Sequence, residues 1–157
     1  MIVPRPRKSQ HGVVLLTVLV FILLSALAAS ALVVRYDTDR RREKEAELLF
    51  AGAQYRKAIA SYYGTIPPGR ARSLPPTLEA LVTDNRFPTP MHHLRRMYVD
   101  PMTGKADWDL IPGPGGFVGV RSRSDLAPVK QSGFGKPFES FENKAHYSEW
   151  TFVIAYP

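Results

Sequence analysis

The sequence predicts an α+β fold in which one long N-terminal helix packs on a small antiparallel sheet. Two observations predict the helix: residues 13–34 form an uncharged apolar run, and residues 37–63, which follow closely, contain no proline. A third observation predicts the sheet, because short segments rich in aromatic and β-branched residues occur towards the C-terminus. Separation of helix and strands along the chain is typical of the α+β class.

The chain begins with a basic head, residues 1–11, which meets the apolar run at Gly12. The positive charges of the head are Arg5, Arg7 and Lys8. The apolar run is interrupted only by Thr17, Ser25 and Ser30, and no Asp or Glu occurs before Asp37. At about 1.5 Å per helical residue the run matches a hydrocarbon core of about 30 Å, so residues 13–34 are predicted to be a transmembrane half-helix.

The following segment is predicted to continue the same helix. Residues 37–63 are rich in Ala, Glu, Arg, Lys and Leu, which are good helix formers, and Gly64 before a pair of prolines is a stop signal. Apolar residues near helical spacing predict one stripe that packs on the sheet: Ala46, Leu49, Phe50, Ala53, Ile59 and Tyr63. Because no breaker separates the two segments, we expect one helix over residues 13–63, apolar all round in its first half and amphipathic in its second.

A small domain is predicted after the helix. Prolines and glycines mark residues 62–76 as a loop, and residues 77–82 predict a short helix with Thr77 as its N-cap. Residues 94–98 fit either a helix or an extended segment. The predicted organisation is a basic leader (1–12), a transmembrane half-helix (13–34), the soluble half of that helix (35–63) and a small periplasmic α+β domain (64–157).

Three segments of the small domain are predicted strands: 108–111, 116–121 and 149–156. The last has the strongest pattern, because it contains Trp150, Phe152 and Val153 among other aromatic and β-branched residues. The glycine- and proline-rich segment between the first two predicts a hairpin loop. Residues 122–147 are polar and are expected to be mostly loop.

The N-terminus is open to three interpretations. It fits a secretory signal peptide, with a cleavage site at Ala29-Ser30-Ala31. It also fits a membrane anchor that is never processed. The third possibility is a leader that is cut after Gly12 while the apolar run is retained. The continuous helix beyond the run favours the third, since a signal peptide does not require that continuity.

The basic head ending in Gly12, the uncharged run and the long helix closed by Tyr62-Tyr63-Gly64 resemble the type IV pilin and type II secretion pseudopilin superfamily. Residues 53–59 and 74–82 resemble the helix end and following loop of pseudopilins, and residues 98–105 resemble the family's Asp-Pro turn. The fold that this resemblance implies is pilin-like, close to that of the major pseudopilins of general secretion systems.

The resemblance also implies site residues. The family's leader peptidase cuts after the glycine and methylates the new N-terminus, which would be Gly12 and Val13 here. Most members carry Glu at the fifth position of the mature chain, where it pairs with a neighbour's N-terminal amine, but this chain has Thr17. Val13 likewise replaces the usual Phe or Met. These departures indicate an atypical member, better suited to a minor or tip position than to a major fibre subunit.

Membrane orientation is predicted differently by charge and by family. The positive charges that follow the run outnumber those before it: Arg35, Arg40, Arg41, Arg42 and Lys44. Counted alone, they would keep the C-terminus inside the cell. The family places the leader in the cytoplasm and the domain in the periplasm. We follow the family, because the mixed Arg and Glu segment also suits the start of an exposed helix.

Composition narrows the chemistry. The net charge is +7, but the Arg-rich segment is followed at once by Glu43, Glu45 and Glu47, unlike the basic face of a nucleic-acid-binding protein. Nucleic acid is therefore not an expected partner. Cysteine is absent, which excludes disulfides, thiolate metal sites and a thiol nucleophile.

No catalytic constellation, cofactor motif or metal site is expected. Adjacent His92 and His93 point to different sides of either secondary structure, so we expect them at the surface. The spacing of Asp100, Asp107 and Asp109 does not fit an EF-hand, and Asp100 suits a turn. Residues 113–119 and 133–136 are glycine-rich without a phosphate-binding motif.

The expected function is therefore assembly and not catalysis. The resemblance implies a single-pass inner-membrane subunit that is assembled into a type II secretion pseudopilus, or a related type IV pilus, for protein export. Its partners would be other pseudopilin subunits, the prepilin leader peptidase, the inner-membrane assembly platform and the membrane itself. The alternatives are a secreted periplasmic binding protein released after Ala31 and an unprocessed membrane-anchored domain.

Overall fold

The computed structural model describes residues 11–155, except for the side chains of His11 and residues 29–36. The predicted basic head therefore lies outside the described residues up to position 10. The elements are α1 (His11–Gly64), α2 (Glu79–Val82), β1 (Asp109–Gly113), β2 (Gly116–Arg121), the 3-10 helices η1 (Glu139–Phe141) and η2 (Tyr147–Glu149), and β3 (Phe152–Val153). The protein is α+β, as the sequence predicts.

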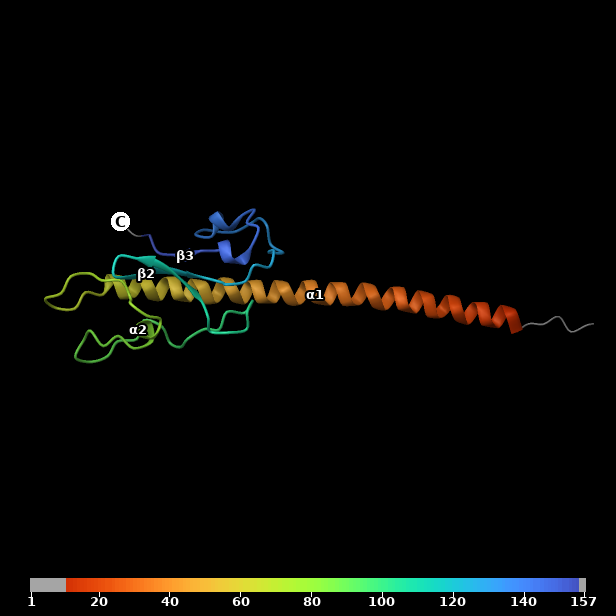
Figure 1. The fold of residues 1–157 in the computed structure, drawn as a ribbon, viewed down its shortest axis with the longest axis horizontal. Helices are drawn as coiled ribbons and strands as arrows, with labels where there is room; N and C mark the ends of the chain where they lie inside the picture. The colour runs from red at the N-terminus through yellow and green to blue at the C-terminus, as the bar shows by residue number, and fades with distance from the viewer. Residues whose placement is uncertain (1–10, 156–157) are drawn as a thin grey trace, which may run out of the picture. The chain divides into compact units, whose positions relative to one another are not determined.

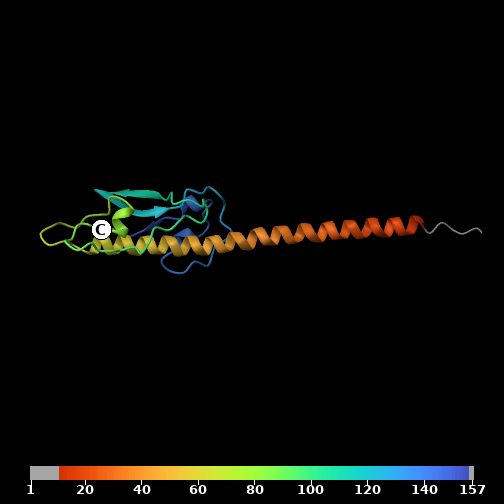
Figure 2. The same ribbon diagram turned by 90° about the horizontal axis from the view of Figure 1, so that it is seen from below.

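The chain divides into two compact units, Met1–Arg40 and Arg41–Pro157. In the first, which we call the N-terminal unit, the described residues all belong to α1. The second, which we call the folded unit, contains the rest of α1 and every other described element. In both views of the folded unit, the strands run alongside the last turns of α1 (Figures 1 and 2).

The long helix predicted over residues 13–63 is confirmed as α1, with 54 residues from His11 to Gly64. No proline interrupts it, and its last turn is closed by Thr65, whose backbone N–H and hydroxyl both donate to the carbonyl of Ser61 at 2.9 and 2.7 Å. The helix ends where the sequence turns to glycine and proline, because glycine readily leaves the helical conformation and proline has no N–H to continue the intrahelical hydrogen bonds.

The sheet has three antiparallel strands in the order β1-β2-β3. β1 and β2 form the predicted hairpin, which pairs Gly113 with Gly116 and is turned by Gly115 at a φ of 73°. A positive φ at this position is readily adopted only by glycine. The register shifts between Ile111 and Pro112. This irregularity suits an edge strand, where a proline need not donate to a neighbour.

The face of α1 that packs in the folded unit differs from the predicted stripe. Its buried hydrophobic residues are Leu48, Ala51, Tyr55, Ala58, Ile59 and Tyr62. Of the predicted stripe, Ile59 is buried but Ala46 is exposed and Phe50 is 57% exposed. The predicted stripe was therefore right in part, since Leu49 and Tyr63 also pack partly buried against the core, but it left out Tyr55 and Tyr62. The Tyr55 hydroxyl both donates to the Tyr98 carbonyl and accepts from its N–H, each at 3.0 Å, so burial costs it no hydrogen bond.

Two predicted elements are shorter than expected. The strand predicted over 149–156 is reduced to Phe152–Val153, because Glu149 belongs to η2 and Trp150 turns into an aromatic cluster, stacked on Phe141 at 5.4 Å. The helix predicted over 77–82 begins at Glu79, with Leu78 and not Thr77 in the cap position. Thr77 still accepts a hydrogen bond of 3.4 Å from the Ala80 N–H.

Residues 94–98 form neither a helix nor a strand, so the helical alternative was wrong for that segment. The polar segment 122–147 is mostly loop, as predicted, but it also supplies core residues that the prediction missed. Phe134, Phe141 and Tyr147 are buried with Trp150 and Phe152. The centroid of the Phe141 ring lies 5.4 Å from that of Trp150 and 5.1 Å from that of Phe152. These contacts hold an irregular segment without regular hydrogen bonding.

Candidate functional site

The predicted processing site lies at the start of α1. Gly12 and Val13 are the second and third residues of the helix, and Val13 is 69% exposed. A Cβ added to Gly12 would meet no atom within 4 Å. The Thr17 hydroxyl donates to the carbonyl of Val13 at 2.8 Å. Thr17 therefore satisfies its own polar group within the helix and needs no partner to do so.

The apolar run is exposed wherever its side chains are described. The exposed large hydrophobic residues extend along α1 from Val13 at 69% to Leu27 at 60%. Contiguous apolar surface of this kind marks a site that meets a membrane or another protein. Over the described residues, no helical segment is both long and apolar enough to cross a membrane. The side chains of residues 29–34, and with them the alternative cleavage site at Ala31, lie outside the described residues, so the transmembrane half-helix stays a prediction.

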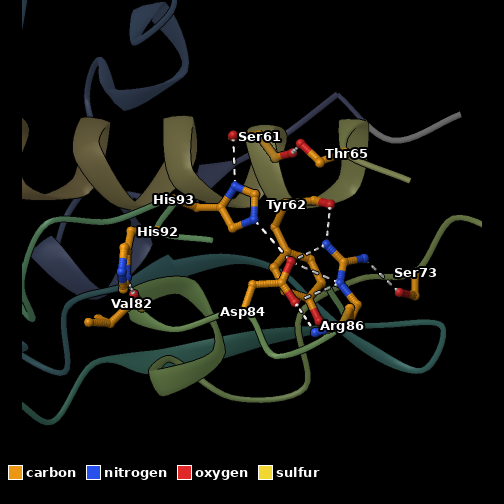
Figure 3. A network of polar contacts seen from close by, with 9 residues as sticks. All are labelled: Ser61, Tyr62, Thr65, Ser73, Val82, Asp84, Arg86, His92 and His93. Atoms are coloured by element: carbon orange, nitrogen blue, oxygen red, sulfur yellow. Dashed lines mark hydrogen bonds and ion pairs between the residues drawn. The ribbon is translucent and has the colours of Figure 1, made fainter. Parts of the chain in front are cut away.

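A buried polar network lies at the opposite end of α1, within the folded unit (Figure 3). Asp84, whose side chain is 1% exposed, pairs with Arg86 at 2.7 Å and lies 3.1 Å from His93 Nε2. Arg86 also donates to the carbonyl of Tyr62 at 2.9 Å and to the hydroxyl of Ser73 at 3.1 Å. The guanidinium thereby joins the end of α1 to the loop that follows it.

The charge of Asp84 is well compensated. Burial by itself would raise its pKa, but hydrogen bonds from the Arg86 side chain and backbone and from His93, together with the Arg86 charge, outweigh burial and lower the pKa to about 2. Arg86 also lies over the Tyr62 ring at 3.5 Å from its centroid. Asp84 is thus ionised at neutral pH and contributes to stability through several charge-assisted bonds.

His93 corrects a sequence prediction. We expected both adjacent histidines at the surface, and His92 is indeed exposed, in contact with the carbonyl of Val82. The His93 side chain, in contrast, is 2% exposed. Its Nδ1 lies 2.8 Å from the Ser61 hydroxyl and its ring meets Tyr62 edge-on at 5.4 Å. The His93 side chain is buried together with its neighbour Leu94, which belongs to the core. The backbone N–H groups of His93 and Leu94 both donate to the carbonyl of Leu81.

The order Ser61–His93–Asp84 matches the connectivity of a serine hydrolase, in which a histidine between carboxylate and hydroxyl activates the serine. Two features oppose that chemistry here. Asp84 is already bound by Arg86 through both carboxylate oxygens. Ser61 also lies in the last turn of α1, at the negative end of the helix dipole, which would repel an oxyanion. We therefore assign the series a structural role.

A cavity of about 710 Å³ opens beside this network. Its charged lining residues are Arg70, Glu79, Asp84 and Arg86. Cations and carboxylates are equal in number, and Asp84 and Arg86 neutralise each other. The cavity therefore offers no net charge that would select an ionic ligand.

A second buried carboxylate joins the first turns of the folded unit to a distant loop. Glu45 is 3% exposed, and its Oε1 accepts from the N–H groups of Val129 and Lys130 at 2.6 and 3.1 Å and from the Tyr147 hydroxyl at 2.8 Å. Burial raises the pKa of Tyr147, and its bond to Glu45 and the Glu45 charge add to the rise. Nothing in the sequence predicted the burial of Glu45, because glutamates in a charged helical segment usually face water.

The three aspartates considered as oxygen ligands have separate roles. Asp100 is buried and organises a turn, accepting from the N–H of Met102 at 2.9 Å and the Ser122 hydroxyl at 2.6 Å, so its predicted turn role is confirmed. Asp107 accepts from Thr103, and Asp109 pairs with Arg121 on the hairpin. Within the described part of the chain, no group of three His, Asp or Glu side chains could hold a metal ion.

The glycine-rich segments are explained by the fold. Gly113, Gly116 and Gly119 belong to the hairpin, where a Cβ would meet neighbouring chain atoms. Gly133 adopts a φ of 74° in the loop before Phe134. Both segments thus have a role in backbone geometry.

Comparisons with models of protein families, with curated proteins and with solved structures found no match to this chain. The function proposed below is therefore supported by the sequence pattern and by the geometry described above.

Proposed function

We propose that this protein is a pseudopilin-like subunit, held in the inner membrane by residues 13–34 and assembled from there into a helical fibre of a type II secretion system or a related type IV pilus. The main support is the exposure of the large apolar side chains of residues 13–27 on a helix that continues into an α+β unit. An isolated apolar helix of this kind is stable in lipid or against other helices, and not in water.

Assembly supplies the mechanism. In the membrane the apolar segment is surrounded by lipid, and in the fibre it is surrounded by the same segment of neighbouring subunits. Small residues in the run, among them Ser25, Ala26 and Ala28, permit close helix contacts. Repeated contacts between different faces of identical or similar subunits do not close on themselves, so they build a filament. In this proposal the folded unit lies on the outside of the filament, in the periplasm.

Thr17 supports an atypical subunit. Glutamate at this position in pilins offers a charge to the N-terminal amine of the neighbouring subunit. Here the hydroxyl is already bonded to the carbonyl of Val13 at 2.8 Å and offers no charge. A subunit without this charge can cap or initiate a fibre but lacks one contact for propagating it, which favours a minor or tip position.

The N-terminus of the mature protein tests the proposal. We expect processing after Gly12 and a methylated Val13 in cells that contain the leader peptidase. The variant Gly12→Leu should abolish processing, and His11→Leu, one residue earlier, is the matched control that should leave it intact. An N-terminus at Leu32 would identify a secreted protein, and an intact head in the unaltered protein would identify a plain anchor; either result would refute the pseudopilin proposal.

A further inference from the structure

A smaller cavity of about 360 Å³ lies in the folded unit between the first turns of α1 there and the loop that Glu45 anchors. Its lining residues are Arg42, Glu45, Ala46, Leu49, Val129 and Lys130. The volume falls in the range of small-molecule sites, about 300–1,000 Å³. The cavity is therefore large enough to receive a small polar group together with part of an attached chain.

The walls of this cavity are fixed with respect to each other. Val129 and Lys130 both donate their backbone N–H to Glu45 Oε1, so the loop is bonded directly to the helix. The Tyr147 hydroxyl donates to the same oxygen at 2.8 Å from the core side. Because three donors fix one carboxylate oxygen, the two walls form a preorganised site and not an accidental gap between mobile segments.

The charges at the cavity are arranged for a single anion. Arg42 and Lys130 are exposed cations that stand on the two opposite walls. With Glu45 as the one carboxylate in the lining, two positive charges and one negative charge leave a net charge of +1. The Lys130 ammonium lies 4.7 Å from the centre of the Phe134 ring, a cation–π contact that restrains this side chain. A phosphodiester carries one negative charge and accepts hydrogen bonds from both cations.

The remaining lining is apolar. Ala46, Leu49 and Val129 supply hydrophobic surface beside the two cations. A free phosphate ion gains nothing from such surface, whereas a phosphate ester with an attached glycerol and acyl chain buries apolar area there. The combination favours an amphipathic phosphate over a soluble one.

We propose that this cavity binds the headgroup phosphate of a phospholipid, with Arg42 and Lys130 as its two cationic contacts. The inference rests on the proposed function, since it requires residues 13–34 to lie in a membrane. In the sequence, Arg42 follows the last residue of that run, Val34, by eight positions, so the cavity is formed by the part of the chain that comes soon after the proposed membrane span. Residues that follow so soon after a membrane-spanning run are expected near the headgroup region that flanks the hydrocarbon core.

Native mass spectrometry of the full-length protein in a nonionic detergent tests the assignment by counting bound lipids during titration. The probes are dioleoyl phosphatidylglycerol, the matched dioleoyl glycerol without phosphate, and inorganic phosphate as competitor. We expect one phospholipid to bind and the diacylglycerol to bind at least about tenfold more weakly, since it lacks the charge-assisted contacts. The double variant Arg42→Gln/Lys130→Gln should weaken phospholipid binding by at least about tenfold.

Two controls keep the result specific. Arg95→Gln/Arg123→Gln removes the same charge from exposed positions outside the cavity and should leave binding within about twofold. Arg42→Lys/Lys130→Arg keeps both charges and should restore binding. Near-ultraviolet circular dichroism of buried Trp108 and Trp150 confirms that each variant is folded.

Three results would overturn the assignment: equal loss of binding in both charge-removing variants, equal binding of diacylglycerol, or full competition by inorganic phosphate, which would indicate a soluble anion. Failure of the proposed function would show in a different measurement, the position of the mature N-terminus. That position does not depend on Arg42 or Lys130. A protein processed after Gly12 whose lipid binding ignores these two residues would retain its proposed function and lose only this site.

Discussion

Two parts of α1 contain many apolar residues but differ in what surrounds them. In residues 13–27 the large apolar side chains are exposed on all sides of the helix. In residues 48–62 one face is buried, and Leu48, Tyr55 and Ile59 are each 0% exposed. The second part finds its partners within its own chain, in the sheet and the aromatic cluster. Apolar content alone therefore does not define a core, because a core also requires a complementary surface.

The complementary surface depends on small residues and on polar groups with partners. Gly52 lies so close to the Phe152 ring that a Cβ would collide with it, whereas a Cβ on Gly12 would meet nothing. Arg56 donates to the Val153 carbonyl at 2.9 Å and so bonds the same part of the helix to β3. These contacts make the second part of α1 specific for one partner, while the first part is suited to any apolar surroundings.

The largest expected effect comes from placing the same charge in each part. Leu48→Arg buries an unpaired cation in the core and should destabilise the folded unit by at least about 5 kcal/mol, enough to unfold a typical domain. Leu23→Arg should leave the stability of that unit within about 0.5 kcal/mol but cost about 3 kcal/mol of membrane insertion. Circular dichroism and alkaline extraction of membranes measure the two effects. Equal damage to folding from both variants would contradict the comparison.

The polar network at the end of α1 gives the next largest effect. Asp84→Asn leaves the Arg86 guanidinium, 12% exposed, without its counter-charge, so we expect a loss of about 3–5 kcal/mol in the free energy of unfolding. Asp109→Asn removes a more exposed pair with Arg121 and should cost less than about 1 kcal/mol. Denaturant unfolding followed by tryptophan fluorescence compares them. If the two variants lost similar stability, the network would be dispensable for attaching α1.

The pH dependence of stability isolates the charge of Asp84. Its folded-state pKa is depressed from 3.8 to about 2, so ionised Asp84 stabilises the fold at pH values above its unfolded pKa, by about 2 kcal/mol at 1.36 kcal/mol per unit. That contribution is lost as the pH falls from about 4 to about 2. The stability difference between the unaltered protein and Asp84→Asn should therefore shrink by about 2 kcal/mol over this interval. A difference that stays constant from pH 5 to pH 2 would show that the carboxylate charge contributes nothing.

The sequence predicted the elements whose signals are local. The helix, the hairpin around Gly115 and the Asp100 turn depend on residues close together in the chain, so their patterns are readable. It did not predict the burial of side chains whose partners lie far along the chain. The burial of Glu45 requires two N–H groups from residues 129 and 130, and the burial of His93 requires Asp84 and Ser61.

The candidate sites follow the same division. Gly12, Val13 and Thr17 could be named from the pattern of charge and hydrophobicity, although their processing stays a prediction. The cavity between Arg42 and Lys130 could not be foreseen, because no spacing rule joins a helix to a loop that lies far along the chain. Two residues of the buried helix face were missed for a related reason. Tyr55 can be buried because the distant Tyr98 carbonyl accepts from its hydroxyl, and Tyr62 because the distant Arg86 covers its ring.

The smallest expected effect compares one methyl group at two glycines of the same helix. Gly52→Ala places a Cβ against the buried Phe152 ring. Overpacking of this kind costs about 1–3 kcal/mol, and the better helix propensity of alanine returns up to about 1 kcal/mol, so a net loss of about 1–2 kcal/mol is expected. Gly12→Ala adds the methyl group in open space and should leave the folded unit unchanged. Thermal unfolding measures both, and the double variant Gly52→Ala/Phe152→Leu should recover part of the loss. A stabilising Gly52→Ala would mean that helix propensity outweighs this contact, and the close packing of α1 on β3 would then not be what distinguishes the two parts of the helix.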